Sequence, residues 1–253
     1  MTITGPFWRY YGGKWRAAPL YPAPRHKQIV EPFAGAAGYA TNYADRDVIL
    51  IERDPRIAAI WRYLIGADPD EILHCPDIPD GGTVDDLPGP DALRDLAGFW
   101  CNQGCAQPRR TPSKWVRTWT ESGAGGNMAG WTQPVRERIA SQIPRIRHWT
   151  LIQGGYEDAP DVEATWFVDP PYQTSAGRLY RYSEIDYQQL GAWCQARSGQ
   201  IIACDQPGAS WLPWTHSVQI CRARHDLDPV TSEVYYHRGG AQLSLLSPLG
   251  AGQ

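Results

Sequence analysis

Short apolar runs that alternate with helical segments are the feature that most constrains how this chain can fold. Runs of strand length lie at residues 28–33, 48–52, 149–153, 164–169 and 200–205. Asp54-Pro55 is a strong helix start, apolar residues then recur at helical spacing, and Gly66 closes the segment. Strands that alternate with helices predict an α/β domain with a mostly parallel sheet and helices on both faces.

The remaining expected elements complete this domain around an interruption. Further helices are expected at residues 38–45, 135–146 and 185–197, and closing strands at 218–222 and 234–237. Residues 68–147 break the pattern: they are first rich in Asp, Pro and Gly, and then, over 99–135, show little periodicity. The sequence therefore predicts one domain built from residues 1–67 and 148–253, with residues 68–147 as an insertion.

The distribution of charge marks this insertion as basic. The net charge of the chain is −3, but residues 101–150 hold eight Lys/Arg against two Glu, so that segment carries +6 and the rest −9. Such asymmetry favours a basic surface on an acidic body. The six cysteines form no CxxC pair and no zinc spacing with His, so no metal site is expected. Because the start lacks a signal-peptide pattern and no apolar run approaches the ~20 residues of a membrane span, we expect no membrane association and a cytoplasmic protein.

Asp169-Pro170-Pro171-Tyr172 follows the apolar run 164–168 directly and carries the strongest chemical signal. A carboxylate and a backbone carbonyl can accept the two hydrogens of a flat amine such as adenine N6, which favours a tetrahedral, more nucleophilic nitrogen. Two prolines restrict the backbone around that carbonyl. Tyr172 offers an aromatic face to an extruded base. The competing interpretation is a proline-rich turn at a strand end.

Three further elements precede it. Glu31-Pro32-Phe33-Ala-Gly35-Ala-Ala-Gly38 follows the first run, where small residues allow a nucleotide-like ligand close to the backbone. Glu52 ends the second run, 14 residues after Gly38, where an acid can bind both ribose hydroxyls. Tyr10-Tyr-Gly-Gly-Lys14 places a lysine on a glycine-rich segment that can reach a carboxylate or phosphate. Each element alone also fits an ordinary loop or a solvated acid.

Taken in order, these four elements resemble the Dam-like family of DNA adenine methyltransferases. The resemblance extends from Tyr10 to about Asp205 and is closer to the compact members carried by bacteriophages and prophages. It implies a class I methyltransferase fold, with a mixed seven-stranded sheet and S-adenosyl-L-methionine over its carboxyl edge. It further implies a bacterial or phage-infected host cytoplasm, and residues 68–147 as a region that recognises double-stranded DNA.

The resemblance also implies roles for individual residues. Tyr10 and Lys14 would contact S-adenosyl-L-methionine, the turn of residues 31–38 would underlie its methionine part, and Glu52 would bind its ribose. Asp169 would serve both the amino group of the cofactor and the target amine, and Tyr172 would stack on the flipped adenine. Tyr156 lies where relatives contact the cofactor adenine. Apart from the resemblance, Asp205 follows the apolar residues 201–204 and is a candidate for the same cleft, although a position outside the cleft is favoured.

Two departures from the family pattern concern the backbone and the cofactor. Ala37 stands where the family has its second turn glycine, and Gly38 follows one place later. The backbone of this turn must therefore differ slightly from that of the family. Gly155 stands where an acid often precedes the tyrosine, which leaves the contact to the cofactor adenine open. The recognition region does not match that of members that read GATC, so no target sequence is carried over.

Arg109, Arg110, Lys114 and Arg117 are interleaved with two tryptophans in the insertion, and we expect these four cations to bind DNA. The competing interpretation is a solvated basic loop. Two alternatives remain for the whole chain: a methyltransferase acting on cytosine N4, RNA or a protein glutamine, or a non-catalytic DNA-binding module of the same fold. The presence of Asp169 rather than Ser or Asn favours adenine. The sequence does not fix the oligomeric state, although a monomer is slightly favoured.

Overall fold

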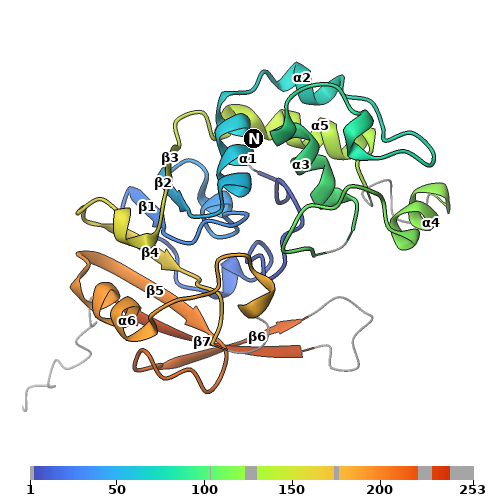
Figure 1. The fold of residues 1–253 in the computed structure, drawn as a ribbon. Helices are drawn as coiled ribbons and strands as arrows, with labels where there is room; N and C mark the ends of the chain where they lie inside the picture. The colour runs from blue at the N-terminus through green and yellow to red at the C-terminus, as the bar shows by residue number, and fades with distance from the viewer. Residues whose placement is uncertain (1–2, 103, 123–129, 174–176, 222–229, 240–253) are drawn as a thin grey trace, which may run out of the picture.

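A single seven-stranded sheet organises the computed structural model, which describes residues 3–102, 104–122, 130–173, 177–221 and 230–239 (Figure 1). The strand order is β3-β2-β1-β4-β5-β7-β6. The first five strands run parallel, and β7 is antiparallel to both β5 and β6. The strands are β1 (Gln28–Glu31), β2 (Asp47–Glu52), β3 (Thr150–Gln153), β4 (Ala164–Val168), β5 (Gly199–Asp205), β6 (His216–Cys221) and β7 (Val230–Arg238). The protein is therefore an α/β protein with a mostly parallel sheet, compatible with a Rossmann-like fold.

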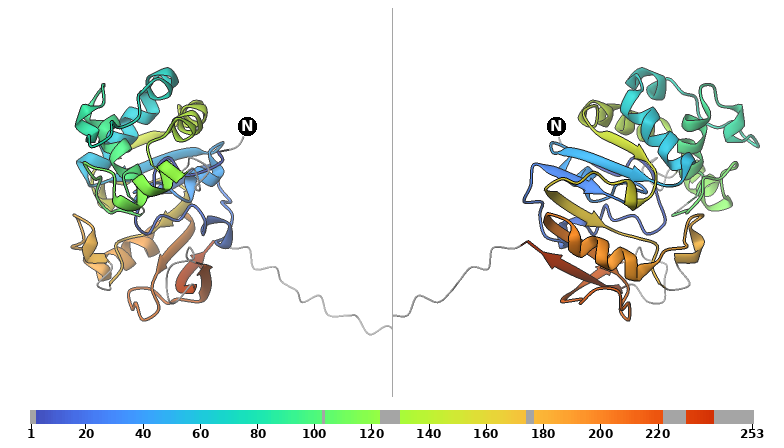
Figure 2. Two further views of the ribbon diagram at one scale, coloured as in Figure 1. Left: turned by 90° about the vertical axis from the view of Figure 1, so that its right-hand side faces the viewer. Right: turned by 60° about the vertical axis from the view of Figure 1, so that its left-hand side comes forward.

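Successive residues of the strands enter two hydrophobic clusters, one on each face of the sheet. Ile29, Leu50 and Phe167 face one cluster, and Val30 and Trp166 face the other, as the period of two in a strand requires. The first face packs against α1, and residues of α3 and α5 join the same cluster, whereas α6 covers the second face (Figures 1 and 2). The helices are α1 (Pro55–Gly66), α2 (Pro69–Leu73), α3 (Asp91–Trp100), α4 (Lys114–Ser122), α5 (Gln133–Gln142) and α6 (Tyr187–Ala196). Short 3-10 helices lie at Ala18–Leu20, Ala40–Tyr43, Val84–Asp86, Ile143–Arg145, Tyr156–Asp158 and Gly177–Leu179.

The helix start expected at Asp54-Pro55 is confirmed. The Asp54 carboxylate accepts a hydrogen bond from the Arg56 amide at 2.9 Å, and Pro55 occupies the first helical position. The α-helical part of the expected helix at 135–146 runs instead from Gln133 to Gln142, and Pro144 lies in the 3-10 turn that follows. The last residue of the strand expected at 218–222 falls outside the described residues.

Two expectations for local structure were wrong. The helix expected at 38–45 is only the 3-10 turn Ala40–Tyr43, because side chains compete for its backbone groups. Asn42 donates to the Gly38 carbonyl at 2.9 Å, and Glu31 accepts from the Ala40 amide at 2.5 Å. In the segment expected to lack periodicity, residues 114–122 form α4. Ser113 caps this helix by accepting from the Val116 amide at 3.2 Å.

The insertion shares its core with the rest of the chain. Ile72, Leu93, Phe99 and Ile139 belong to the same hydrophobic cluster as Leu50 of the sheet. In Figures 1 and 2, α2, α3 and α5 stack beside α1 at one end of the molecule, while α4 projects from the side towards which the β5 arrow points. Helices α2, α3 and α5 of residues 68–147 thus extend the sheet's own core, whereas α4 stands apart from it.

Candidate functional site

A pocket of about 1020 Å³, including the space at its open mouth, lies at the carboxyl edge of the parallel strands. Its walls come from the segments that follow β1, β2, β3 and β4, together with residues 10–14 and 180–189. The carboxyl ends of parallel strands meet at one edge, where ligands of open α/β sheets bind.

Most of the residues singled out in the sequence line this one pocket. The structure brings together Tyr10, Lys14, Glu31, Pro32, Phe33, Gly35, Gly38, Glu52, Tyr156, Asp169 and Pro171. Pro170 and Tyr172 are not among its lining residues, and Asp205 lines a separate shallow hollow with Gln173 and Tyr187. The candidate Asp205 therefore does not line the main pocket. Asp205 ends β5, and its carboxylate accepts a hydrogen bond from the Trp211 indole N–H.

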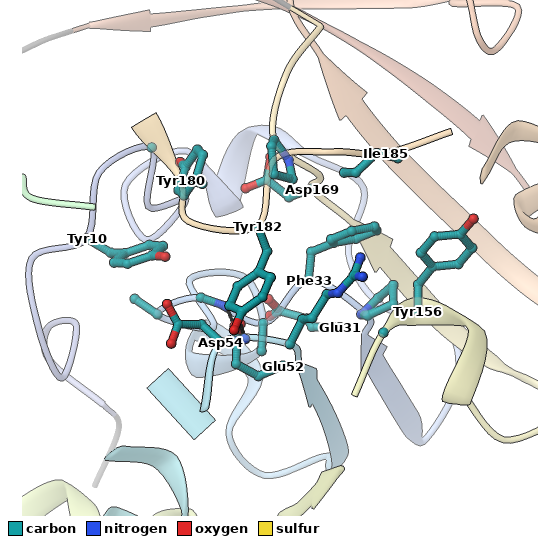
Figure 3. Close-up of a pocket in the computed structure, with 18 of the residues that line it drawn as sticks. Tyr10, Glu31, Phe33, Glu52, Asp54, Tyr156, Asp169, Tyr180, Tyr182 and Ile185 are labelled. Atoms are coloured by element: carbon teal, nitrogen blue, oxygen red, sulfur yellow. Dashed lines mark hydrogen bonds between the residues drawn. The ribbon is translucent and has the colours of Figure 1, made fainter. Parts of the chain in front are cut away.

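The turn after β1 is fixed by the acid that ends β2. Glu52 accepts hydrogen bonds from the Gly35 amide at 2.9 Å and the Asp54 amide at 2.8 Å. Trp61 of α1 donates its indole N–H to the Gly35 carbonyl at 2.7 Å. Burial raises the pKa of Glu52 to about 7, although the hydrogen bonds from these backbone amides favour its ionised form. Glu52 thus holds the turn while it also lines the pocket floor (Figure 3).

Two glycines let the N-terminal element lie against this turn. A Cβ on Gly35 would meet the Tyr10 ring at 2.9 Å, and Gly35 has a φ of +45°. A Cβ on Gly38 would lie 2.5 Å from the Trp15 amide nitrogen and 2.7 Å from that of Lys14. Ala37 has a φ of +47°, in the left-handed region that favours glycine. The spacing of small residues therefore reflects the close crossing of residues 10–15 over residues 35–38.

Lys14 and Asp169 form a buried ion pair at the centre of the site. The Lys14 ammonium lies 2.8 Å from Asp169 Oδ1 and 3.6 Å from Glu233 Oε1, and it donates to the Gly12 carbonyl at 3.0 Å. Burial lowers the pKa of Lys14, but Asp169 and Glu233 outweigh it and the net shift is upward. Burial raises the pKa of Asp169, and Lys14 opposes that rise. The pKa of Asp169 therefore stays raised overall, and the ion pair with Lys14 limits that rise.

Further contacts around this ion pair involve Cys204 and Tyr172. The Cys204 thiol lies 3.3 Å from Asp169 Oδ1. The Lys14 ammonium lies 5.0 Å from the centre of the Tyr172 ring, a cation–π contact. The Tyr172 hydroxyl is buried and has no hydrogen-bond partner among the described residues. In this structure Tyr172 therefore packs on Lys14, outside the pocket wall.

Sequence reasoning missed several residues of the site. Glu233 of β7 and Tyr21, whose hydroxyl donates to it, come from distant parts of the chain. Tyr180 donates to the Tyr11 carbonyl at 2.8 Å and lies beside Tyr10 (Figure 3). Tyr182 points into the pocket, with the Arg53 guanidinium 5.7 Å from its ring centre (Figure 3). The aromatic and basic run Arg178-Leu-Tyr-Arg-Tyr182 is the sequence signal that could have found the last two.

Phe33 and Tyr156 form the apolar end of the pocket. Their ring centres are 5.6 Å apart, and Tyr156 also meets Trp193 of α6 edge to face at 5.3 Å. Figure 3 shows the two rings on the side of the pocket opposite Tyr10. The site therefore joins an aromatic wall to a floor of carboxylates.

The four cations expected to bind DNA are all exposed, but they do not form one set. Arg110 forms an ion pair with Asp85, its Nε donating at 3.0 Å. Arg117 donates to the Pro112 carbonyl at 2.7 Å and lies on α4 with Lys114. On the same helix, the rings of Trp115 and Trp119 are 5.2 Å apart. Of these four cations, Arg110 is therefore the one that pairs with a carboxylate within the described residues.

Burial of Glu31 predicts a measurable pH dependence of stability. Burial raises the pKa of Glu31 from 4.5 to about 8, although the Ala40 amide favours the ionised form. Between these values the folded protein holds a proton that the unfolded chain has released, so the free energy of unfolding falls as pH rises. This one group contributes at most about 1.4 kcal/mol per pH unit. Glu31→Gln keeps an acceptor for Ala40, so urea unfolding of this variant should show a flatter dependence between pH 5 and 8. Parallel curves for the two proteins would contradict this assignment.

Comparison with known proteins adds no relative: no protein-family model matches the chain, and no curated protein is significantly similar to it. Among the described residues, no group of three or more His, Cys, Asp or Glu side chains is placed to hold a metal ion. None of the helices in the described part of the chain is long and apolar enough to cross a membrane.

Proposed function

We propose that this protein is an S-adenosyl-L-methionine-dependent DNA methyltransferase of the Dam-like family that methylates adenine N6. The observation that carries the proposal is the convergence of Tyr10, Lys14, Glu52 and Asp169 on one pocket, although they span about 160 residues of sequence. The mixed seven-stranded sheet is compatible with the class I fold that the motifs imply.

The chemistry of the pocket fits this cofactor. Its lining holds more acidic than basic side chains, which suits a ligand with a sulfonium and an ammonium group. The acids are Glu31, Glu52, Asp54, Glu157, Asp169, Glu184 and Asp186, and the cations are Lys14, Arg53 and Arg181. S-adenosyl-L-methionine would supply the methyl group. Glu52 would bind its ribose, while Phe33 and Tyr156 would contact its adenine.

Asp169 would act on the target amine. Lys14 favours its ionised form, and a carboxylate can accept a hydrogen bond from adenine N6. The Pro170 carbonyl would accept the second N6 hydrogen, and Tyr172 would stack on the extruded base after moving from its packed position on Lys14. The amine would then lose its proton to solvent after the transfer.

The insertion would hold the duplex. Arg109, Lys114 and Arg117 would bind phosphates, while Arg110 already neutralises Asp85. The log–log salt slope of DNA affinity is expected to fall by about 0.9 for each phosphate that the protein no longer neutralises. We therefore expect Lys114→Ala to lower both the affinity and the slope more than Arg110→Ala, as measured by fluorescence anisotropy with duplex DNA over a series of salt concentrations. Intact affinity and slope after replacing all four cations would remove them from the DNA interface.

Methylome sequencing in a host that lacks DNA methylation tests the proposed function. Expression of the wild-type chain is expected to produce N6-methyladenine at a defined set of sites. N4-methylcytosine, or labelled methyl groups in RNA or protein glutamine, would support an enzyme that acts on another amine. Binding of the cofactor and of DNA without any methylation would support a non-catalytic module.

A further inference from the structure

Helix α6 begins beside the Asp169–Tyr172 loop, and its first residue reaches that loop. Asp186 caps the helix by accepting from the amides of Gln188 and Gln189, each at 3.0 Å. Tyr187 follows, and its hydroxyl donates to the Pro171 carbonyl at 2.5 Å. Tyr187 is not a lining residue of the main pocket. Among the described residues, its hydrogen bond to the site is the one to the Pro171 carbonyl.

A second chain of contacts holds Tyr187 in place. Its ring lies 6.1 Å from that of Trp211, and the Trp211 indole N–H donates to Asp205 Oδ2 at 2.7 Å. Asp205 is fully buried at the end of β5 and also accepts from the Gln206 amide at 2.6 Å. The end of β5 is thus linked through Trp211 and Tyr187 to the loop that follows β4.

The proline pair explains why such a support is needed. Proline has no backbone N–H, so residues 170 and 171 can be held by hydrogen bonds only through their carbonyls. Tyr187 binds the Pro171 carbonyl. Among the described residues, no hydrogen bond is made to the Pro170 carbonyl, which leaves it as the acceptor next to Asp169.

We propose that Tyr187 is a positioning residue: by holding the Pro171 carbonyl, it fixes the Asp169–Pro170 pair for the target amine. This inference rests on the proposed function. Tyr187→Phe removes one hydroxyl and leaves every lining residue of the pocket unchanged. Small displacements of catalytic groups slow a reaction strongly without weakening ligand binding. We expect kcat to fall at least about tenfold, with KM for DNA and the Kd of S-adenosyl-L-methionine within about twofold.

The sequence offers a direct readout of the contact, independent of activity. Pro171–Tyr172 is the only Pro–Tyr step in the chain, so proline labelled with ¹³C at the carbonyl and tyrosine labelled with ¹⁵N give one Pro171 cross-peak. In Tyr187→Phe the carbonyl signal should move upfield, because the carbonyl loses a hydrogen bond. Tyr63→Phe is the matched control. Tyr63 lies on α1 outside the pocket and donates to Glu71 at 3.2 Å, so its removal should leave both the cross-peak and kcat unchanged.

The outcomes separate the two proposals. A shifted cross-peak together with a lower kcat supports the positioning role. An unmoved cross-peak, or a shifted one with kcat unchanged, overturns it. A wild-type protein that binds the cofactor but methylates no DNA would refute the proposed function instead, and the cross-peak would then decide by itself whether Tyr187 holds the loop.

Discussion

Asp169→Asn is expected to lower the rate of methyl transfer by about a hundred- to a thousandfold, the usual effect of removing one group that stabilises a transition state. Asparagine keeps the size of the side chain and an acceptor oxygen. It loses the negative charge that strengthens the hydrogen bond from the amine. Lys14 retains Glu233, 3.6 Å away, as a carboxylate partner, so the buried ammonium is not left uncompensated. The variant should therefore fold, and single-turnover transfer to duplex DNA measures the loss.

Asp47→Asn is the control for this result. Asp47 also pairs with a lysine, Lys27, at 3.0 Å, but that pair is exposed and lies outside the pocket. Its loss should change neither turnover nor stability appreciably, because exposed ion pairs contribute little. Near-normal turnover of Asp169→Asn, with the Asp47→Asn control also active, would remove Asp169 from the chemistry.

Gly38→Ala is expected to have the largest effect on the fold around the site. The new methyl group would lie 2.5 Å from the Trp15 amide nitrogen and 2.7 Å from that of Lys14, and both are backbone atoms that cannot turn aside. Overpacking typically costs about 1–3 kcal/mol, and here the strain would push Lys14 away from Asp169. We expect stability to fall by about 3 kcal/mol and cofactor affinity to fall at least about tenfold.

Gly66→Ala provides the matched substitution. Gly66 ends α1, is exposed, and a Cβ there would meet no atom within 4 Å. Alanine at this position should be neutral or stabilising by up to about 1 kcal/mol. Urea unfolding and titration calorimetry with S-adenosyl-L-methionine measure both variants. Suppose that Gly38→Ala matched Gly66→Ala in stability and cofactor affinity. The close crossing of residues 14–15 over residue 38 would then contribute neither to the free energy of unfolding nor to cofactor binding.

The meeting of Glu31, Glu52 and Asp169 could be predicted from sequence because each follows a short apolar run. Parallel strands place such residues at one edge, so the alternation of strands and helices already brought them together. The glycines at 35 and 38 were interpreted as space for a ligand. The structure adds that they also make room for Tyr10 and Lys14, which only the packed chain reveals.

Other parts of the site depend on contacts between distant residues. Glu233 reaches Lys14 because β7 pairs antiparallel to β5, and a lone acid in a closing strand gives no sign of that pairing. Tyr187 likewise gains its contact with Pro171 from the packing of α6. Helix α4 was missed because its helical signals, the cap at Ser113 and the pair Trp115–Trp119, lie within a segment rich in glycine and arginine.

Asp169 and the Pro170 carbonyl are central to the proposed reaction, in which they bind the amine of an adenine beside S-adenosyl-L-methionine. The most direct test is to incubate the purified protein with cofactor labelled in its methyl group and with unmethylated duplex DNA, and to analyse the nucleosides by mass spectrometry. We expect label in N6-methyladenine, in an amount that Asp169→Asn reduces to background. Label only in another base, or none in DNA while the cofactor is bound in the pocket, would contradict this role.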